Sequence, residues 1–353
     1  MLCKSKELAY FCAVDSLTQI VLGAACGEAV LGKKIGNRAL LFGAIGGTIP
    51  DLDVIIGRLL YSNEIHVMAF HRGFMHSFLF AIIGCLAFGW ITHFLYNRGD
   101  RLGTSTLTDW IWLYFWSIFT HPILDSFTPY GTQLFAPFSD YRVAFNTISV
   151  ADPLYTLPFL LSLLILMFHK RSSPGRRWWF KAGVMVSSLY LTLTVVNKFH
   201  IDRVFEKSFE KKGISYSRFS AQPTILNNVL WYAVAETEDQ YIMSYYSLLD
   251  KESYAVQMLS TPKNHDMLDM TDPNLKLLTW FSKGYYSLKK DFTTDQYIYT
   301  DLRYPLLNPE DPNSAIFNFT IYSNKGEWDI IPFRGNPPSG EDFQLFIDRV
   351  KGI

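Results

Sequence analysis

The segment Trp110-Ile-Trp-Leu-Tyr-Phe-Trp-Ser-Ile-Phe-Thr-His121-Pro-Ile-Leu-Asp125 decides the fold, because a strongly apolar run ends in two ionisable side chains. Its apolar part, residues 110–120, predicts a buried helix. His121 and Asp125 are four residues apart at the end of this helix, so the imidazole and the carboxylate share one face and can bind one cation. The pair taken alone is equally typical of a simple His–Asp hydrogen bond, so the surrounding chain has to separate the two interpretations.

Acidic residues are distributed unevenly along the 353-residue chain. The 32 basic and 32 acidic residues balance, which gives no reason to expect a nucleic-acid partner. Only 11 acidic residues lie in residues 1–199, and 21 lie in 200–353. All four cysteines lie in the first part, at spacings unlike those of zinc ligands. We therefore expect an N-terminal extension at 1–14, a membrane-embedded domain at 15–199 and a soluble domain at 200–353.

The first domain is predicted to be an all-α polytopic membrane domain with about five to six hydrophobic helices. The clearest run, residues 74–96, has 23 residues and can cross about 30 Å of hydrocarbon. The other runs are residues 16–31, 39–49, 109–127, 153–168 and 180–199.

The last part of the chain predicts a smaller α+β domain. Residues 201–212 have apolar side chains at helical spacing and can extend the preceding helix, and residues 229–249 read as a β-hairpin around a polar turn. Residues 296–302 and 316–322 are further β-type runs. Residues 339–351 predict a closing helix capped by Ser339.

Two carboxylates follow Pro50 in the motif Pro50-Asp-Leu-Asp53. In an extended or turned segment, residues two apart project to the same side, so Asp51 and Asp53 can face one site. An ordinary helix-terminating turn also uses Asp, but it needs only one of them.

Two histidines surround an arginine in His71-Arg-Gly-Phe-Met-His76. Residues five apart lie about 140° around a helix, so His71 and His76 converge only if the chain turns between them. We assign that freedom to Gly73. A single histidine at a helix start is more typical of a solvated cap, but a pair beside Arg72 favours a functional site.

Basic residues alone set the predicted topology. The loop at residues 169–181 contains five lysines and arginines and no acid, so it is expected in the cytoplasm. The protein is then a multi-pass protein of the cytoplasmic (inner) membrane with its C-terminal domain outside the cytoplasm. This topology brings the candidate ligands together at the outer ends of their helices: Asp51, Asp53, His71, His76, His121 and Asp125.

Three more polar residues fall at the same level, and each is either a ligand or a helix cap. Asp15 begins the first hydrophobic helix, and Ser16 with Gln19 matches a capping box. Asp152 precedes Pro153 as an ordinary N-cap does, and we favour the cap for this residue.

With these motifs in place, the first 168 residues resemble the YdjM-like family of membrane-bound metal-dependent hydrolases. The matching pieces are Asp15-Ser-Leu-Thr-Gln19, Pro50-Asp-Leu-Asp53, His71-Arg-Gly-Phe-Met-His76, His121-Pro-Ile-Leu-Asp125 and Thr128-Pro-Tyr-Gly131. That family is distantly similar to the zinc-dependent phospholipase C and single-strand nuclease group. The resemblance implies a metal and phosphoester chemistry.

We therefore expect a metal-dependent hydrolase that acts on an ester or phosphoester of a lipid or envelope component in the bilayer. The six candidate ligands would hold one or two divalent ions, with zinc favoured by the His and carboxylate set. Asp51, Asp53 and Arg72 are the expected catalytic residues, with Arg72 neutralising a phosphate oxygen. The alternative is a non-enzymatic membrane protein, either a transporter or an assembly factor with a structural metal site. The sequence leaves the oligomeric state open.

Overall fold

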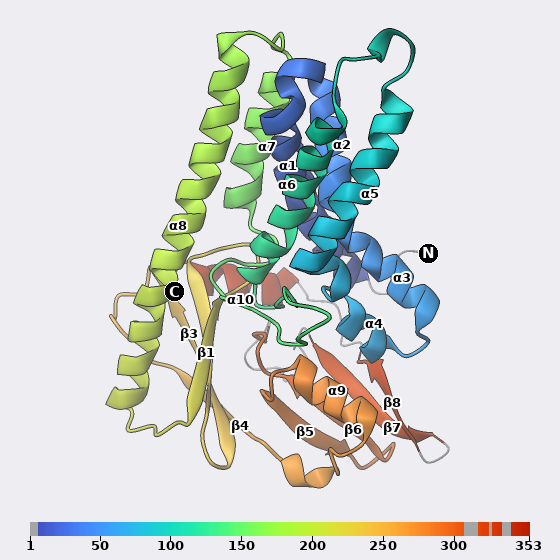
Figure 1. The fold of residues 1–353 in the computed structure, drawn as a ribbon. Coiled ribbons are helices and arrows are strands. Elements are labelled where there is room, and N and C mark those ends of the chain that lie inside the picture. The colour runs from blue at the N-terminus through green and yellow to red at the C-terminus, as the bar shows by residue number, and fades with distance from the viewer. Residues whose placement is uncertain (1–5, 307–316, 325–326, 334–339) are drawn as a thin grey trace. The chain divides into compact units, whose positions relative to one another are not determined.

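The computed structural model describes residues 6–306, 317–324, 327–333 and 340–353 (Figure 1). Its contacts divide the chain into two units. The first comprises Met1–Ile56 and Phe70–Val195, and the second comprises Gly57–Ala69 and Val196–Ile353. Residues 57–69, which we had placed in the membrane-embedded domain, therefore pack with the C-terminal part of the chain.

The first unit is built from helices that pack side by side (Figure 1). The long ones are α1 (Lys6–Ile35), α2 (Asn37–Thr48), α5 (Phe78–Tyr96), α6 (Leu107–Ser126), α7 (Pro153–Met167) and the first part of α8 (Pro174–Lys211). Short helical segments are η1 (Pro50–Leu52), α3 (Asp53–Leu60), η2 (Phe74–His76) and η3 (Gly99–Arg101). Helices α1 and α2 are in backbone contact, because a Cβ atom on Gly23 would lie 2.4 Å from the carbonyl oxygen of Gly43.

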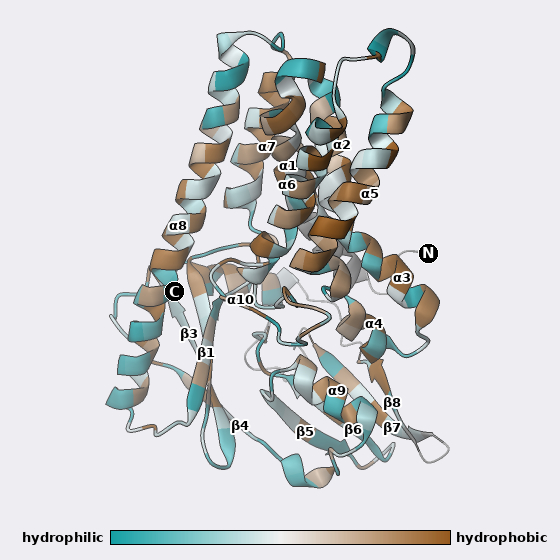
Figure 2. Ribbon diagram, in the orientation of Figure 1, coloured by the Kyte–Doolittle hydropathy of each residue, from teal (hydrophilic) through white to brown (hydrophobic). Residues whose placement is uncertain are grey.

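The predicted number of membrane-spanning helices is not supported. Among the described residues, α5 and α8 are long and apolar enough to cross a bilayer, and hydrophobic residues cover most of α5 (Figure 2). A third span exists only if α2 and the segment Pro50–Leu60, which meet at 44°, count as one broken helix. Helix α7 has 15 residues, fewer than the 20 or so that a span requires. The first unit is therefore a helical region with two to three candidate spans.

Helix α1 begins earlier than the sequence predicted. It includes residues from Lys6 onward, so Ser16 lies inside the helix and the capping-box interpretation of Ser16 and Gln19 is wrong. Part of the supposed extension at residues 1–14 is likewise helical.

The second unit contains two four-stranded antiparallel sheets, with strand orders β1-β2-β3-β4 and β5-β6-β7-β8. The strands are β1 (Arg218–Pro223), β2 (Leu230–Glu236), β3 (Gln240–Ser247), β4 (Met258–Pro262), β5 (Tyr286–Asp291), β6 (Gln296–Asp301), β7 (Asn318–Asn324) and β8 (Glu327–Pro332). Helices α4 (Glu64–Phe70), η4 (His265–Met267), α9 (Pro273–Phe281) and α10 (Gly340–Val350) complete it, with α4 ending one residue inside the first unit.

The core of the second unit confirms several predictions. The end of α8 continues through the predicted stalk, and its Val204, Phe205 and Phe209 pack against the first sheet. The predicted hairpin is β2 and β3, in which Tyr232 lies opposite Tyr245. Strands β6 and β7 occupy the two other predicted β-runs, and α10 is the closing helix. The expected cap of that helix, Ser339, lies outside the described residues.

Candidate metal centre

Three short stretches of the first unit bring the candidate ligands together. His121 and Asp125 lie in the last two turns of α6, one turn apart and both buried. Asp51 lies in η1, which follows α2 because Pro50 cannot continue that helix. His76 ends η2, directly before α5.

Four donor atoms from these stretches converge on one point. The Nε2 atoms of His76 and His121 lie 3.1 Å apart, and each lies 3.4 Å from Asp51 Oδ1 and 3.4 Å from Asp125 Oδ2. The oxygen Asp125 Oδ2 is buried without a hydrogen-bond partner in the described part of the chain. The Arg72 guanidinium forms an ion pair with this oxygen, with its Nε 3.2 Å away, and the oxygen and the two imidazole nitrogens form a group that could hold a metal ion.

The Nδ1 contacts of the two histidines leave their Nε2 lone pairs directed at this point. Nδ1 of His121 lies 2.6 Å from the carbonyl oxygen of Gly47, to which it donates. Nδ1 of His76 lies 3.0 Å from Asp53 Oδ2. A ring nitrogen that donates in this way makes the opposite nitrogen the ligand.

The donor separations that involve a histidine nitrogen suit a small ion. Metal–ligand bonds of about 2.0 to 2.2 Å give tetrahedral edges of about 3.3 to 3.6 Å, because the edge is roughly 1.6 times the bond. Of the six separations between the four donors, the five that involve a histidine nitrogen are 3.1 Å once and 3.4 Å four times. Two imidazoles with two carboxylates suit zinc better than calcium or magnesium, which prefer oxygen ligands alone.

Asp53 lies behind the donors, where it orients two histidines. Its Oδ1 lies 2.8 Å from His71 Nδ1, and its Oδ2 faces His76 Nδ1 and accepts a hydrogen bond of 2.9 Å from the Arg72 backbone N–H. Both carboxylate oxygens are thus engaged. Asp51 and Asp53, predicted to face one site, both lie against His76, with Asp51 at its Nε2 and Asp53 at its Nδ1.

Arg72 is buried, and it holds Asp125 in place. Its Nε lies 3.2 Å from Asp125 Oδ2, and its Nη1 donates to Thr128 Oγ1 at 2.8 Å. The turn between the two histidines depends on this residue, since Arg72 has a left-handed φ of 58° whereas Gly73 has a φ of −90°. Gly73 contributes to the turn as well, because its ψ of −129° lies outside the usual regions and an added Cβ would lie 2.8 Å from the carbonyl oxygen of Phe70.

His71 is at the accessible edge of the cluster. The side chains of His71 and Asp51 are 18% and 20% exposed, whereas those of His76, His121 and Asp125 are at most 1% exposed. His71 forms a second possible ligand group with Asp51 and His76. All six predicted ligands are thus gathered in one cluster, with four donors at its centre, Asp53 behind them and His71 at its open side.

The charges of the cluster act on His76 in opposite directions. Burial alone lowers the pKa of this imidazole, but Asp53 and Asp51 outweigh burial and hold the pKa above its usual value. A cation that binds here therefore displaces a proton, so binding is expected to weaken as the pH falls.

The region that carries this cluster has relatives. Residues 14–201, which include every residue of the cluster, match the YdjM inner membrane protein family. The chain belongs to this family. It is also 27% identical over 198 residues to the uncharacterized protein YfhP of Bacillus subtilis (strain 168), a match that covers 53% of the chain and 57% of that relative. The chain thus spans little more than half of the relative's length, and no solved structure gives a significant match.

Within this YdjM-family region, Gln19 supports the cluster in a way that the sequence did not reveal. Its Nε2 donates to Asp125 Oδ1 at 2.6 Å and lies 3.3 Å from the carbonyl oxygen of His121. Gln19 is buried in α1, a helix rich in glycine and alanine. The available signal was a single amide in a small-residue run, and the apparent capping motif obscured it.

Asp152 lies apart from the cluster and has the capping role that we favoured. Its Oδ1 accepts a hydrogen bond from the backbone N–H of Leu154 at 2.9 Å, and its Oδ2 accepts one from the Tyr190 hydroxyl at 2.7 Å. The side chain of Asp15 is outside the described part of the structure, so its role stays a prediction.

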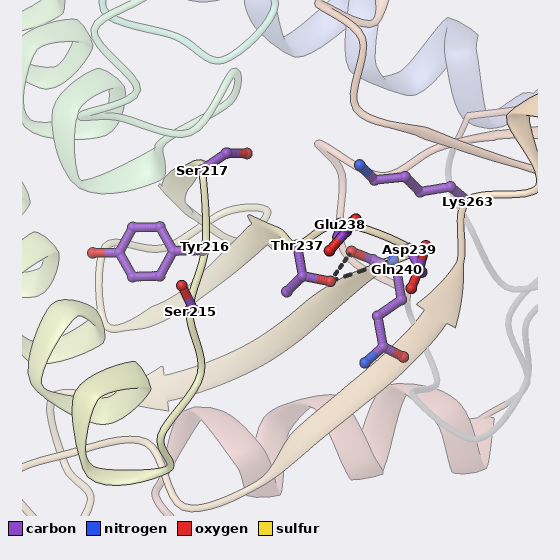
Figure 3. A pocket seen from close by; sticks show the side chains of 8 residues that line it. All are labelled: Ser215, Tyr216, Ser217, Thr237, Glu238, Asp239, Gln240 and Lys263. Carbon is purple, nitrogen blue, oxygen red and sulfur yellow. Dashed lines mark hydrogen bonds between the residues drawn. The ribbon is translucent and has the colours of Figure 1, made fainter.

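A separate hollow in the second unit has a different chemistry (Figure 3). It lies around the turn between β2 and β3, where Thr237 Oγ1 accepts a hydrogen bond from the Gln240 backbone N–H. Its lining consists of Ser215, Tyr216, Ser217, Thr237, Glu238, Asp239, Gln240 and Lys263. These residues include no histidine or cysteine, so the hollow is not a second centre of the same kind.

Proposed function

We propose that this YdjM-family protein is a membrane-bound, metal-dependent hydrolase of an ester or phosphoester in a lipid or envelope component. The observation that carries the proposal is the asymmetry of the cluster. Three of the four central donors are buried, while the side chains of Asp51 and His71 are partly exposed. Water and substrate can therefore approach a metal centre next to a hydrogen-bonded base.

The residues of the open side suit the transfer of a proton during hydrolysis. When a divalent metal is bound, it lowers the pKa of coordinated water toward about 7. His71 donates its Nδ1 proton to Asp53, so its Nε2 can accept a proton from the attacking water. The same nitrogen can then return that proton to the oxygen that leaves the ester as the bond breaks. Asp53 keeps the imidazole in the required tautomer and orientation.

The catalytic roles proposed from the sequence are therefore redistributed. Arg72 was expected to neutralise a substrate phosphate, but its buried guanidinium is engaged by Asp125 and Thr128. We assign it the positioning of Asp125. Asp53 is assigned the positioning of His71 and His76, and His71 takes the role of the general base.

A structural metal site in a non-enzymatic protein is the second candidate. The four-donor arrangement favours it, because structural zinc is held by four protein ligands whereas catalytic zinc keeps a position open. The transporter version has less support, since an ion path requires ionisable groups inside the membrane. Glu28, an acid within α1, is bound by Arg176 through contacts of 2.7 and 2.6 Å.

Metal coordination and turnover together separate the two candidates. The zinc-loaded protein should cleave at least one member of a panel of carboxylic esters, phosphomonoesters and phosphodiesters. His71→Ala should lower turnover by about 10²- to 10⁴-fold while zinc stays bound, as expected for the loss of a general base. If the zinc-loaded parent cleaves nothing, or if His71→Ala keeps full activity, the structural site becomes the better interpretation.

The orientation is part of the same proposal. Five basic residues in the loop at 169–181 favour a cytoplasmic position for that loop and an extracytoplasmic position for the C-terminal unit. A topology reporter inserted after Ser173 should be active only when it is cytoplasmic, and one fused after Ile353 only when it is outside. The reverse pattern would place the metal centre on the cytoplasmic side.

A further inference from the structure

The connection between α6 and α7 exposes an unusual set of side chains. Residues 128–150 contain two charged residues, Asp140 and Arg142, and Arg142 is buried. The exposed side chains include four aromatic ones: Phe135, Phe138, Tyr141 and Phe145, which are 54%, 85%, 65% and 51% exposed. Large apolar side chains scattered singly over a surface are ordinary, but four of them on one connection indicate a contact surface.

The inner side of this connection touches the metal centre. Arg142 Nη2 donates to the carbonyl oxygen of His71 at 2.7 Å, and the backbone N–H of Gln133 donates to the carbonyl oxygen of Arg72 at 3.0 Å. Thr128 binds the Arg72 guanidinium. These hydrogen bonds thus connect the segment that carries the exposed aromatic residues to the open side of the centre.

The outer side continues the surface of a candidate membrane span. The backbone N–H of Phe78, the first residue of α5, donates to the carbonyl oxygen of Leu134 at 3.0 Å, and its ring lies 5.7 Å from that of Phe135. Helix α5 exposes Ile82, Ile83, Leu86, Trp90, Ile91, Phe94 and Leu95. The connection is therefore contiguous with an apolar surface that crosses the bilayer.

We infer that residues 128–150 rest in the interfacial layer of the bilayer and hold the metal centre against lipid headgroups. Aromatic side chains favour that layer, where an apolar ring meets hydrated headgroups. The occupant of the aromatic surface is thus the lipid bilayer. Resting on the proposed function, the inference also identifies the substrate as a bilayer-resident lipid whose ester or phosphoester reaches the centre from the headgroup level.

Depth-dependent quenching tests the bilayer contact without any need for turnover. The four native cysteines are replaced by serine, and a single cysteine is introduced as Phe138→Cys, Leu86→Cys or Phe292→Cys. Each variant is labelled at that cysteine with an environment-sensitive fluorophore and placed in phosphatidylcholine vesicles. Phe292, in the second unit, is 87% exposed and matches Phe138 at 85%. Lipid nitroxides placed near the headgroup should quench the label at 138, nitroxides placed deep on the acyl chain should quench the label at 86, and neither should quench the label at 292. Quenching at 86 without quenching at 138 would overturn the inference.

Substrate presentation gives the second readout. Phe138→Ser should lower turnover of a vesicle-borne lipid ester by about tenfold, since it removes one aromatic side chain that the bilayer would bury. The same variant should leave turnover of a water-soluble short-chain ester unchanged, and Phe292→Ser should change neither. An equal loss on both substrates would show that Phe138 acts on the fold and would contradict the lipid assignment. Normal quenching without turnover by the parent would refute the hydrolase proposal and its lipid substrate while the bilayer contact stands.

Discussion

The Nε2 atoms of His76 and His121 face each other at 3.1 Å, while Nδ1 of His76 lies 3.0 Å from Asp53 Oδ2 and Nδ1 of His121 donates to the carbonyl oxygen of Gly47. Two neutral nitrogens in this relationship present lone pairs to each other, which is unfavourable unless a proton or a metal lies between them. This distance is therefore the most direct structural sign of a cation site in the chain.

Removal of either histidine should empty the centre. We expect His76→Ala or His121→Ala to lower the zinc content of the purified protein from near stoichiometric to a small fraction, measured by elemental analysis. His200→Ala is a suitable control, because His200 is exposed on α8 and lies in the second unit. Full zinc occupancy in both variants would show that the metal, if bound, lies elsewhere.

The substitution Asp53→Asn should weaken metal binding without abolishing it. The amide keeps the shape of the side chain but loses the charge that fixes the Nδ1 proton of His76, and loss of such a partner typically lowers metal affinity by about 10- to 100-fold. Competition against a chelator of known affinity measures this change. Asp51→Asn should have the larger effect, because it alters a donor atom. An equal effect of the two variants would contradict the division of roles between these carboxylates.

The ion pair of Glu28 and Arg176 should stabilise the helical unit strongly. Both side chains are at least nine-tenths buried, and Arg176 also donates to Asn37 Oδ1 at 2.7 Å. Arg176→Met leaves a buried carboxylate unpaired, which is expected to lower the free energy of unfolding by about 3 to 5 kcal/mol. The double variant Glu28→Met, Arg176→Met should recover most of that loss. The measurement is unfolding of the detergent-solubilised protein.

A partly exposed ion pair provides the comparison for that measurement. Lys198 and Asp202 are one turn apart on α8. Lys198→Met should change the free energy of unfolding by less than about 1 kcal/mol. If Arg176→Met has no greater effect than Lys198→Met, the buried pair does not hold the helices together.

Glu236 should make the second unit sensitive to acid. Burial raises the pKa of this carboxyl, but Lys263 and Arg218 outweigh burial and hold the pKa below its usual value. The ionised form is therefore stabilised on folding, and its contribution is present at neutral pH and lost as the pH falls through the folded-state pKa. At neutral pH the thermal unfolding temperature should be lower for Glu236→Gln than for the parent. This difference in temperature should shrink as the pH is lowered. Glu238→Gln, in the exposed neighbouring turn, should show no such pattern.

The composition of the metal centre was accessible from the sequence, but the division of roles within it was not. His121 and Asp125 share a helix face by spacing alone, and hydrophobic runs with basic loops were enough to bring Asp51 and His76 to the same level. Which oxygen faces which nitrogen depends on the tight turn after α2 and on the left-handed conformation of Arg72. Pro50 indicates that turn, but the left-handed conformation has no signature in residue type, since an arginine rarely adopts it.

The fold was predicted best where periodicity is strong. The apolar stripe of residues 201–212 was enough to predict a helix. The apolar runs of β2 and β3 around a polar turn were enough to predict a hairpin. The predicted number of spans is not supported because hydrophobic runs also form helices too short to span a bilayer, such as α7 with 15 residues and α2 with 12. The start of α1 was missed because a Ser-x-x-Gln motif occurs by chance inside a helix.

Residues 57–69 have a consequence for the energetics of the metal centre. The chain leaves the first unit after Asp53 and returns before His71, and between them His66 Nε2 lies 2.9 Å from Asn274 Oδ1 in α9. A loose tether between Asp53 and His71 would impose an entropy penalty whenever the centre closes on its ion. Because residues 57–69 pack within the C-terminal unit, their conformational entropy is already reduced when that unit folds. Zinc affinity and the stability of the C-terminal unit are then linked quantities, and a protein shortened to the helical region should bind metal more weakly than the full chain even though every donor is present.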